Sequence, residues 1–127
     1  HESALDGMGR RILVVDDVEL NREWLADLLA GYHFDVTVAA DGQAAWEALQ
    51  RERFDLLLCD QAMPGWDGWA LLARVRTLCP YVPSVLYSAA PPHRPQGFDG
   101  ELDFDAVLLK PAASDSLLAC IDRLARH

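Results

Sequence analysis

Short runs of apolar residues alternate along this chain with longer stretches in which apolar side chains recur every three or four residues. The first pattern is typical of strands that are buried on both faces, and the second of helices with one apolar face. A chain that alternates between the two folds as a parallel sheet with helices on both sides. The expected strands are residues 12–15, 36–39, 56–59, 85–87 and 106–109.

Four stretches carry the helical pattern, and their ends have recognisable signals. Gly31 fits the end of the first helix, and an Asp41-Gly42 turn opens the second. The third is expected to start near Gly68, and Ser114 is the expected N-cap of the last. The side chains expected on the apolar faces are, in chain order, Leu20, Trp24, Leu25, Leu28 and Leu29; Ala45, Trp46 and Leu49; Leu71, Leu72, Val75 and Leu78; and Leu117, Leu118, Ile121 and Leu124.

The pattern breaks between the last two expected strands, where another helix should connect them. Proline inside a helix removes a hydrogen bond and clashes with the preceding turn, at a cost of about 3 kcal/mol. This helix is therefore expected to be short, displaced or missing. The residues that crowd its place are Pro91, Pro92, Pro95, Gly97 and Gly100.

The chain is acidic, with 20 acidic and 11 basic residues and a net charge of −9. Binding to nucleic acid or to an anionic membrane depends on Lys and Arg that neutralise phosphates, so neither is an expected direct partner. No apolar run approaches the roughly 20 residues of a membrane-spanning helix. The polar residues 1–9 are expected to be a linker or a cloning remnant, and residues 10–127 to form one domain.

Three cysteines, Cys59, Cys79 and Cys120, lie far apart in apolar surroundings. An odd number at such spacing does not suit a disulfide framework or a metal site. We expect them to be small core residues of a protein in the reducing cytoplasm.

Polar residues stand at the ends of four of the expected strands. Asp16 and Asp17 follow the first, Asp60 the third, Ser88 the fourth and Lys110 the fifth. Since ligands bind beyond the carboxyl ends of strands in open parallel sheets, these side chains are expected to converge. Three neighbouring carboxylates cannot all stay ionised without a cation. Lys110 supplies one positive charge, and Mg²⁺, which prefers carboxylate, carbonyl and water oxygens, suits the rest.

Four motifs in this order and spacing resemble the receiver domain of two-component response regulators. They are VVDD (14–17), LLLCDQAMPGWDG (56–68), YSA (87–89) and LLKP (108–111). The resemblance covers the chain from Arg10 to its end. It implies a doubly wound, five-stranded parallel sheet of flavodoxin-like topology, arranged as a three-layer sandwich. It also implies that the Lys110-Pro111 bond is cis, which is affordable before proline.

The resemblance implies that Asp60 accepts a phosphoryl group from phosphohistidine, with Lys110 pairing with the phosphoryl oxygens and Ser88 donating a hydrogen bond to them. Such a domain catalyses its own aspartyl phosphorylation and dephosphorylation. Alignment and charge neutralisation suit this reaction, because a carboxylate is a weak nucleophile. Histidine kinase activity would require a kinase core elsewhere in the full-length protein.

The resemblance also implies a Mg²⁺ site. Asp17 and Asp60 are its expected direct carboxylate ligands, and the backbone carbonyl of Ala62 is the third protein ligand. Asp16 is expected to bind the ion through a water molecule.

Two features concern signalling and architecture. Receiver domains usually carry Tyr or Phe three residues before the lysine, as half of a conformational switch, and here Val107 stands in that place. The segment VDDVELNREWL (15–25) resembles receivers of hybrid sensor histidine kinases. The implied partner is a histidine kinase or a histidine phosphotransfer domain.

Three other function classes remain open at this point. A degenerate receiver could act as a docking module that needs no phosphorylation, as Val107 and the altered fourth helix suggest. A haloacid-dehalogenase-like phosphatase also uses a strand-end aspartate, but needs a second Asp where Ala62 stands. A flavodoxin-like electron carrier shares the architecture, but Asp16 and Asp17 would repel a flavin phosphate.

Overall fold

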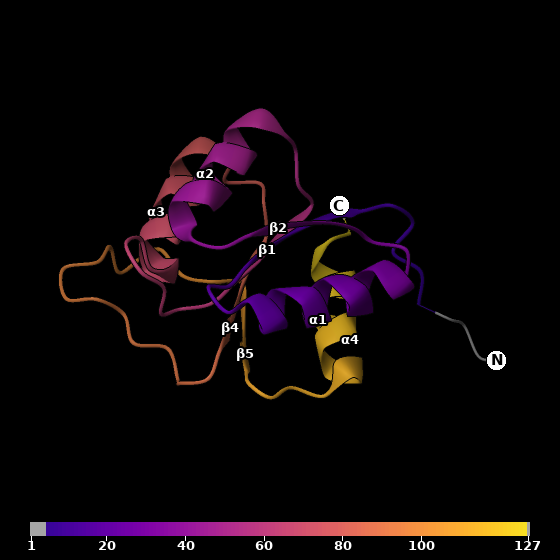
Figure 1. The fold of residues 1–127 in the computed structure, drawn as a ribbon. Coiled ribbons are helices and arrows are strands. Elements are labelled where there is room, and N and C mark those ends of the chain that lie inside the picture. Colours follow the sequence, from indigo (N-terminus) through magenta and orange to yellow (C-terminus); the bar gives the residue numbers. More distant parts are fainter. Residues whose placement is uncertain (1–4, 127) are drawn as a thin grey trace.

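The computed structural model describes residues 5–126 and confirms the predicted class of fold. Five parallel strands form one sheet in the order β2-β1-β3-β4-β5, and helices lie on both of its sides (Figure 1). The cis Lys110-Pro111 bond is also present. The elements are β1 (Arg11–Val15), α1 (Glu19–Gly31), β2 (Asp35–Ala39), α2 (Gly42–Arg51), β3 (Leu56–Cys59), α3 (Gly68–Leu78), β4 (Ser84–Ser88), β5 (Ala106–Leu109) and α4 (Ser114–Leu124).

The sheet separates two hydrophobic cores. Side chains alternate along each strand, so Ile12 and Val14 of β1 enter one core while Leu13 and Val15 enter the other. Helices α1 and α4 cover the first core, and α2 and α3 cover the second (Figure 1). All four residues of β3 are buried, as expected of the central strand in a sheet that is covered on both faces.

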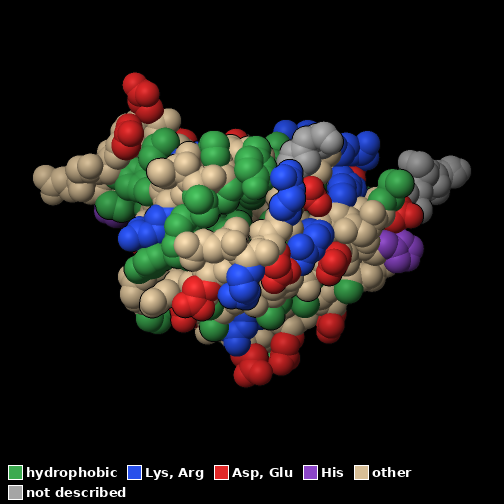
Figure 2. All heavy atoms as spheres, turned by 90° about the horizontal axis from the view of Figure 1, so that it is seen from above, with side chains coloured by type: hydrophobic (Ala, Val, Ile, Leu, Met, Phe, Trp, Pro, Cys, Tyr) green, Lys and Arg blue, Asp and Glu red, His purple; other side chains and the backbone are tan. Residues whose placement is uncertain are grey.

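No helix connects β4 to β5 in the described chain, as the prolines predicted. Residues 89–105, called the arm below, instead form an irregular loop that projects from the side of the sheet (Figure 1, orange). Without a helix there, two β5 side chains stay partly exposed: Val107 is 39% exposed and Leu109 50%. Figure 2 looks down on the α2 and α3 side, where acidic and basic side chains intermingle and hydrophobic ones gather toward the arm.

The apolar faces of the helices agree with prediction only in part. In α1, Leu25 and Leu29 are buried, but Leu20 is 75% exposed and Trp24 46% exposed. Residues 20, 24 and 28 form one row along the helix and 21, 25 and 29 the next, and the second row faces the sheet. The prediction was therefore wrong for Leu20 and Trp24. It was also wrong for Leu78, which is 50% exposed at the last position of α3.

Helix starts follow the sequence signals in two of three cases. The side chains of Asp41 and Asp67 cap α2 and α3, each accepting a 2.8 Å hydrogen bond from a backbone N–H three residues later. Ser114 was predicted as the N-cap of α4, and this is wrong. Ser114 is the first helical residue, and the N-cap is Ala113, which has no side chain that could accept a bond.

Residues 5–10 run along the domain and contact it at several points. The backbone N–H of Gly7 donates to the carbonyl of Tyr32 at 2.6 Å, and a Cβ at Gly7 would lie 2.6 Å from the Phe34 ring. Arg10 donates to the carbonyl and the carboxylate of Asp122 in α4. The boundary at residue 10 stays a prediction, and residues 1–4 of the expected linker lie outside the described residues.

The three cysteines are all buried free thiols, which confirms their assignment to the core. Burial raises the pKa of the Cys59 thiol, and the neighbouring Asp60 charge raises it further, so this thiol stays protonated. Within residues 5–126, none of the helices has the length and apolar character needed to cross a bilayer.

Candidate functional site

The ends of β1 and β3 place two of the predicted acids side by side. Val15 and Cys59 are register partners in these neighbouring strands, so the residues that follow them, Asp16 and Asp60, leave the sheet together. The Asp60 N–H donates to the carbonyl of Val15 at 3.0 Å, which extends the ladder by one residue. Carboxylate oxygens of Asp16, Asp17 and Asp60 all lie within 4.8 Å of one another.

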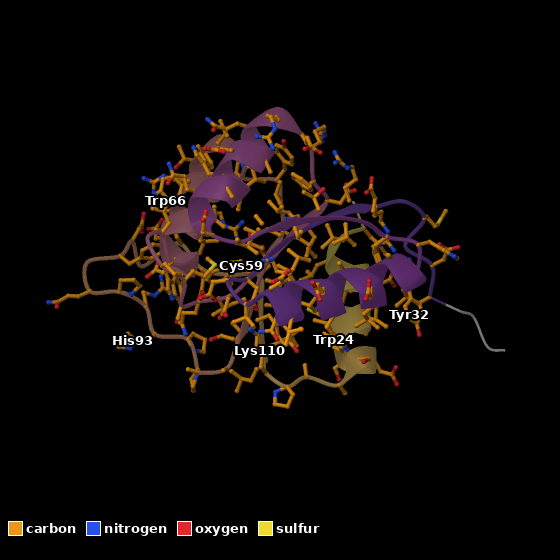
Figure 3. All side chains as sticks on the ribbon, in the orientation of Figure 1. Trp24, Tyr32, Cys59, Trp66, His93 and Lys110 are labelled. Carbon is orange, nitrogen blue, oxygen red and sulfur yellow. The ribbon has the colours of Figure 1, made fainter. Side chains whose placement is uncertain are left out.

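Lys110 reaches this cluster from the end of β5, beside the N-terminal end of α1 (Figure 3). Its Nζ donates to Asp16 Oδ2 at 2.7 Å and to Asp60 Oδ2 at 3.1 Å. Burial alone lowers the pKa of Lys110, but the bonds and charges of Asp16 and then Asp60 outweigh it and raise the pKa overall. The lysine therefore stays cationic at neutral pH and bridges the two acids.

The three acids differ in how far the protein satisfies them. Asp16 is buried and accepts bonds from Lys110, from the Val18 N–H at 2.9 Å and from Asn21 Nδ2 at 3.3 Å. Asp60 is 14% exposed and accepts from Lys110 and from the Gln61 N–H at 2.7 Å. Asp17 is exposed, and no side chain or N–H within residues 5–126 donates to its carboxylate. The cluster is thus closed at Asp16 and open toward Asp17.

Ser88 and Ala62 occupy the edges of the site. Ser88 is buried at the end of β4; its carbonyl accepts from the Lys110 N–H at 2.8 Å, and its Oγ accepts from the Ala90 N–H at 3.2 Å. Ala62 is exposed in the loop that follows β3. The contribution of the Ala62 carbonyl to metal binding stays a prediction, as do the roles of the other site residues.

The arrangement fits a divalent cation. Three carboxylates and one ammonium group leave a formal excess of two negative charges at one edge of the sheet. Oxygen ligands from two or three carboxylates, completed by water, are the donor set that Mg²⁺ prefers. Asp17 is exposed and Asp60 is partly exposed, so an ion in solvent can reach both carboxylates.

Two residues at the site, Gln61 and Tyr87, make contacts that the sequence analysis did not predict. The Gln61 side chain accepts from Trp69 Nε1 at 2.9 Å and donates to the carbonyl of Pro91 at 3.1 Å. The Tyr87 ring of β4 has its centroid 5.4 Å from Lys110 Nζ. A glutamine directly after Asp60 is the one signal in the sequence that could have drawn attention to the first of these contacts.

Gly68, the first residue of α3, allows the Asp60 loop to fold tightly. A Cβ at this position would overlap the carbonyl oxygen of Asp60 and lie 3.2 Å from Cα of Gln61. Both are backbone atoms, so they cannot move aside as a flexible side chain would.

Gly68→Ala is therefore expected to lower the free energy of unfolding by about 1–3 kcal/mol, measured by urea denaturation. Gly31→Ala, at the end of α1, is the matched control, because nothing lies within 4 Å of its Cβ. The control is expected to be neutral or slightly stabilising. Equal stability of the two variants would contradict the tight approach described here.

Comparison with known proteins agrees with this geometry. The family model of the response regulator receiver domain matches residues 12–122. The response regulator protein FleR of Pseudomonas aeruginosa is 36% identical over 129 residues, which cover 94% of this chain and 25% of FleR. The sensor histidine kinase RcsC of Salmonella typhi is 36% identical over 106 residues, or 84% of this chain and 11% of RcsC. The chain thus spans a quarter or less of these relatives.

Solved structures show the same fold. The response regulator TrrA of Thermotoga maritima, crystallised in complex with Mg²⁺ and BeF, superimposes with a TM-score of 0.81 at 26% identity. The match covers 91% of this chain and 98% of TrrA. With the sheet order, the acidic cluster and the family match in agreement, the chain belongs to the family of response regulator receiver domains of two-component signalling.

Proposed function

We propose that Asp60 accepts a phosphoryl group from a phosphohistidine in a Mg²⁺-dependent reaction. The observation that carries this proposal is the cluster of Asp16, Asp17 and Asp60 at the carboxyl edge of the sheet, where Lys110 bonds to Asp16 and Asp60. Of the three acids, Asp60 suits the acceptor role, because Asp16 is buried beneath Lys110 and Asp17 is free to serve a metal.

The residues of the chain supply alignment and charge. A carboxylate oxygen of Asp60 bonds to phosphorus as the phosphorus–nitrogen bond breaks, and the electron pair of that bond returns to the imidazole of the donor. Two groups already hold the Asp60 carboxylate in place, the Gln61 N–H on Oδ1 and Lys110 on Oδ2. Lys110 remains beside the transferred group and offsets its charge. Ser88 donates a hydrogen bond to the phosphoryl oxygens.

The acidic edge is the proposed Mg²⁺ site. Asp17, Asp60 and the backbone carbonyl of Ala62 would hold the ion directly, and Asp16 would do so through a water molecule. The three hydrogen bonds that Asp16 already accepts support its indirect role. When bound, the ion neutralises charge on the phosphoryl oxygens during transfer.

The proposed partner is a histidine kinase or a histidine phosphotransfer domain. The likeness to RcsC supports a place within a hybrid sensor kinase, with residues 10–127 as the receiver. The buried free thiols support a cytoplasmic location. A docking module that needs no phosphorylation is the less favoured alternative. Docking alone would not require three clustered carboxylates with a lysine bonded to Asp60.

The proposal is tested by incubating the protein with acetyl phosphate and Mg²⁺ and measuring its intact mass. A gain of one phosphoryl group that requires Mg²⁺ is expected. Borohydride, which reduces an aspartyl phosphate to homoserine, should then label residue 60 in a peptide digest. A native mass that stays unchanged, or a label on another residue, would sink the proposal and leave the docking module in its place.

A further inference from the structure

Gln61 links the acceptor residue to two distant segments of the chain. Its backbone N–H donates to Asp60 Oδ1, while its side-chain oxygen accepts from Trp69 Nε1 of α3 at 2.9 Å and from the His93 N–H of the arm at 2.5 Å. Its side-chain nitrogen donates to the carbonyl of Pro91 at 3.1 Å. One residue therefore contacts Asp60 with its backbone and the arm with its side chain.

Trp69, which donates to Gln61, also contacts several residues of the arm. Its indole is buried and lies edge-on to Phe98 and Phe104, with ring centroids 5.3 Å and 5.0 Å away. The Arg94 guanidinium lies 5.1 Å from the centre of the Trp69 ring and donates to the carbonyl of Asp99 at 3.0 Å. Residues of the arm thus pack around Trp69, and the indole N–H of Trp69 donates to the Gln61 side chain.

A second contact ties the beginning of the arm to the site. The Ala90 N–H donates to Ser88 Oγ at 3.2 Å. Ser88 is also the hydroxyl that the proposed function assigns to the phosphoryl oxygens. The two residues that bond to the first part of the arm, Ser88 and Gln61, are therefore both residues of the proposed phosphorylation site.

We propose that Gln61, with Trp69, carries the phosphorylation state of Asp60 to the arm. This inference rests on the proposed function. The usual aromatic partner of the serine hydroxyl is absent, because Val107 stands there and is 39% exposed. The arm stands in place of the helix that would otherwise connect β4 to β5. Its hydrogen bonds to the site are made by Gln61 and Ser88.

Phosphorylation changes the partners of both ties. The Gln61 N–H now meets a carboxylate, and hydrogen bonds to ionised acceptors are about twice as strong as neutral ones. Once Asp60 is an acyl phosphate, the oxygens bonded to its carboxyl carbon no longer carry the full charge, and this bond weakens. At the same time Ser88 turns toward the phosphoryl oxygens and away from the Ala90 N–H. The arm then shifts relative to α3.

The test uses the full chain labelled with ¹⁵N, and Mg²⁺ with beryllofluoride as the stand-in for the phosphoryl group. The amide signals of Gly97 and Gly100 report on the far part of the arm, and the indole signal of Trp69 reports on the link. All three are expected to shift in the native protein. Uptake of a phosphoryl group from acetyl phosphate is measured separately by mass.

Gln61→Leu removes all three side-chain hydrogen bonds at similar size. It is expected to lose the shifts of Gly97 and Gly100, and its phosphoryl uptake is measured alongside. Gln50→Leu, at an exposed position in α2, is the matched control and should behave as the native protein. Trp69→Phe keeps a ring in the aromatic cluster but removes the N–H, and should clearly reduce the two glycine shifts.

The outcomes separate this inference from the proposed function. Phosphoryl uptake without any shift in the arm of the native protein overturns the inference alone. Shifts that persist in both Gln61→Leu and Trp69→Phe also overturn it. A native protein that takes up no phosphoryl group overturns the inference and the proposed function together.

Discussion

Asp60→Asn is expected to lose phosphoryl uptake from acetyl phosphate completely. The amide that replaces the carboxylate carries no charge and is not a competent nucleophile, and no neighbouring acid can take over. Asp16 is buried and already accepts three hydrogen bonds, one of them from Lys110. Asp17 lacks the hydrogen bonds from Lys110 and Gln61 that orient the Asp60 carboxylate. Intact mass spectrometry in the presence of Mg²⁺ measures the loss.

Asp67→Asn provides the control for the same chemical change at a nearby acid. Asp67 caps α3 through a 2.8 Å bond to the Ala70 N–H, and asparagine caps helices about as well as aspartate. This variant should be phosphorylated as the native protein is. Residual uptake in Asp60→Asn at the native level would remove Asp60 from its proposed role.

Asp17→Ala is expected to weaken Mg²⁺ binding at least about a hundredfold. Even residues that merely support a metal ligand are worth about 10–100-fold in affinity, so loss of a direct ligand should cost more. The Asp17 carboxylate accepts no hydrogen bond from residues 5–126, so its removal should leave the fold unaffected. A Mg²⁺ titration followed by tryptophan fluorescence, with thermal unfolding alongside, separates the two effects.

Glu19→Ala is the matched control for Asp17→Ala. Glu19 is an exposed acid in the first turn of α1, two residues along the chain, and it is not part of the carboxylate cluster. Its removal lowers the local negative charge by the same amount without removing a proposed ligand. If both variants bind Mg²⁺ equally well, the affinity comes from general charge and Asp17 is no ligand.

Local patterns and one general rule were enough to predict the sheet and the composition of its acidic edge. Strand and helix periods differ clearly in this chain, and side chains at the carboxyl ends of parallel strands must share an edge. Asp16, Asp17, Asp60 and Lys110 therefore came together as expected. Their individual roles depend on bound ligands and stay predictions.

Features that depend on packing between distant segments were not predictable in the same way. The choice between the two apolar rows of α1 depends on how the helix lies on the sheet, which its own sequence does not reveal, and so Leu20 and Trp24 were misplaced. The contacts of Gln61 with Trp69 and His93 join three segments that no local pattern connects. The proline-rich composition of the arm excluded a helix without indicating what would replace it.

The contact between Arg10 and Asp122 has a consequence for how this domain can be built into a longer polypeptide. It brings the start and the finish of the folded unit to the same place. Units whose entry and exit points adjoin can be inserted between other modules with little disturbance to either. Sequences attached before and after this receiver would thus emerge close to one another.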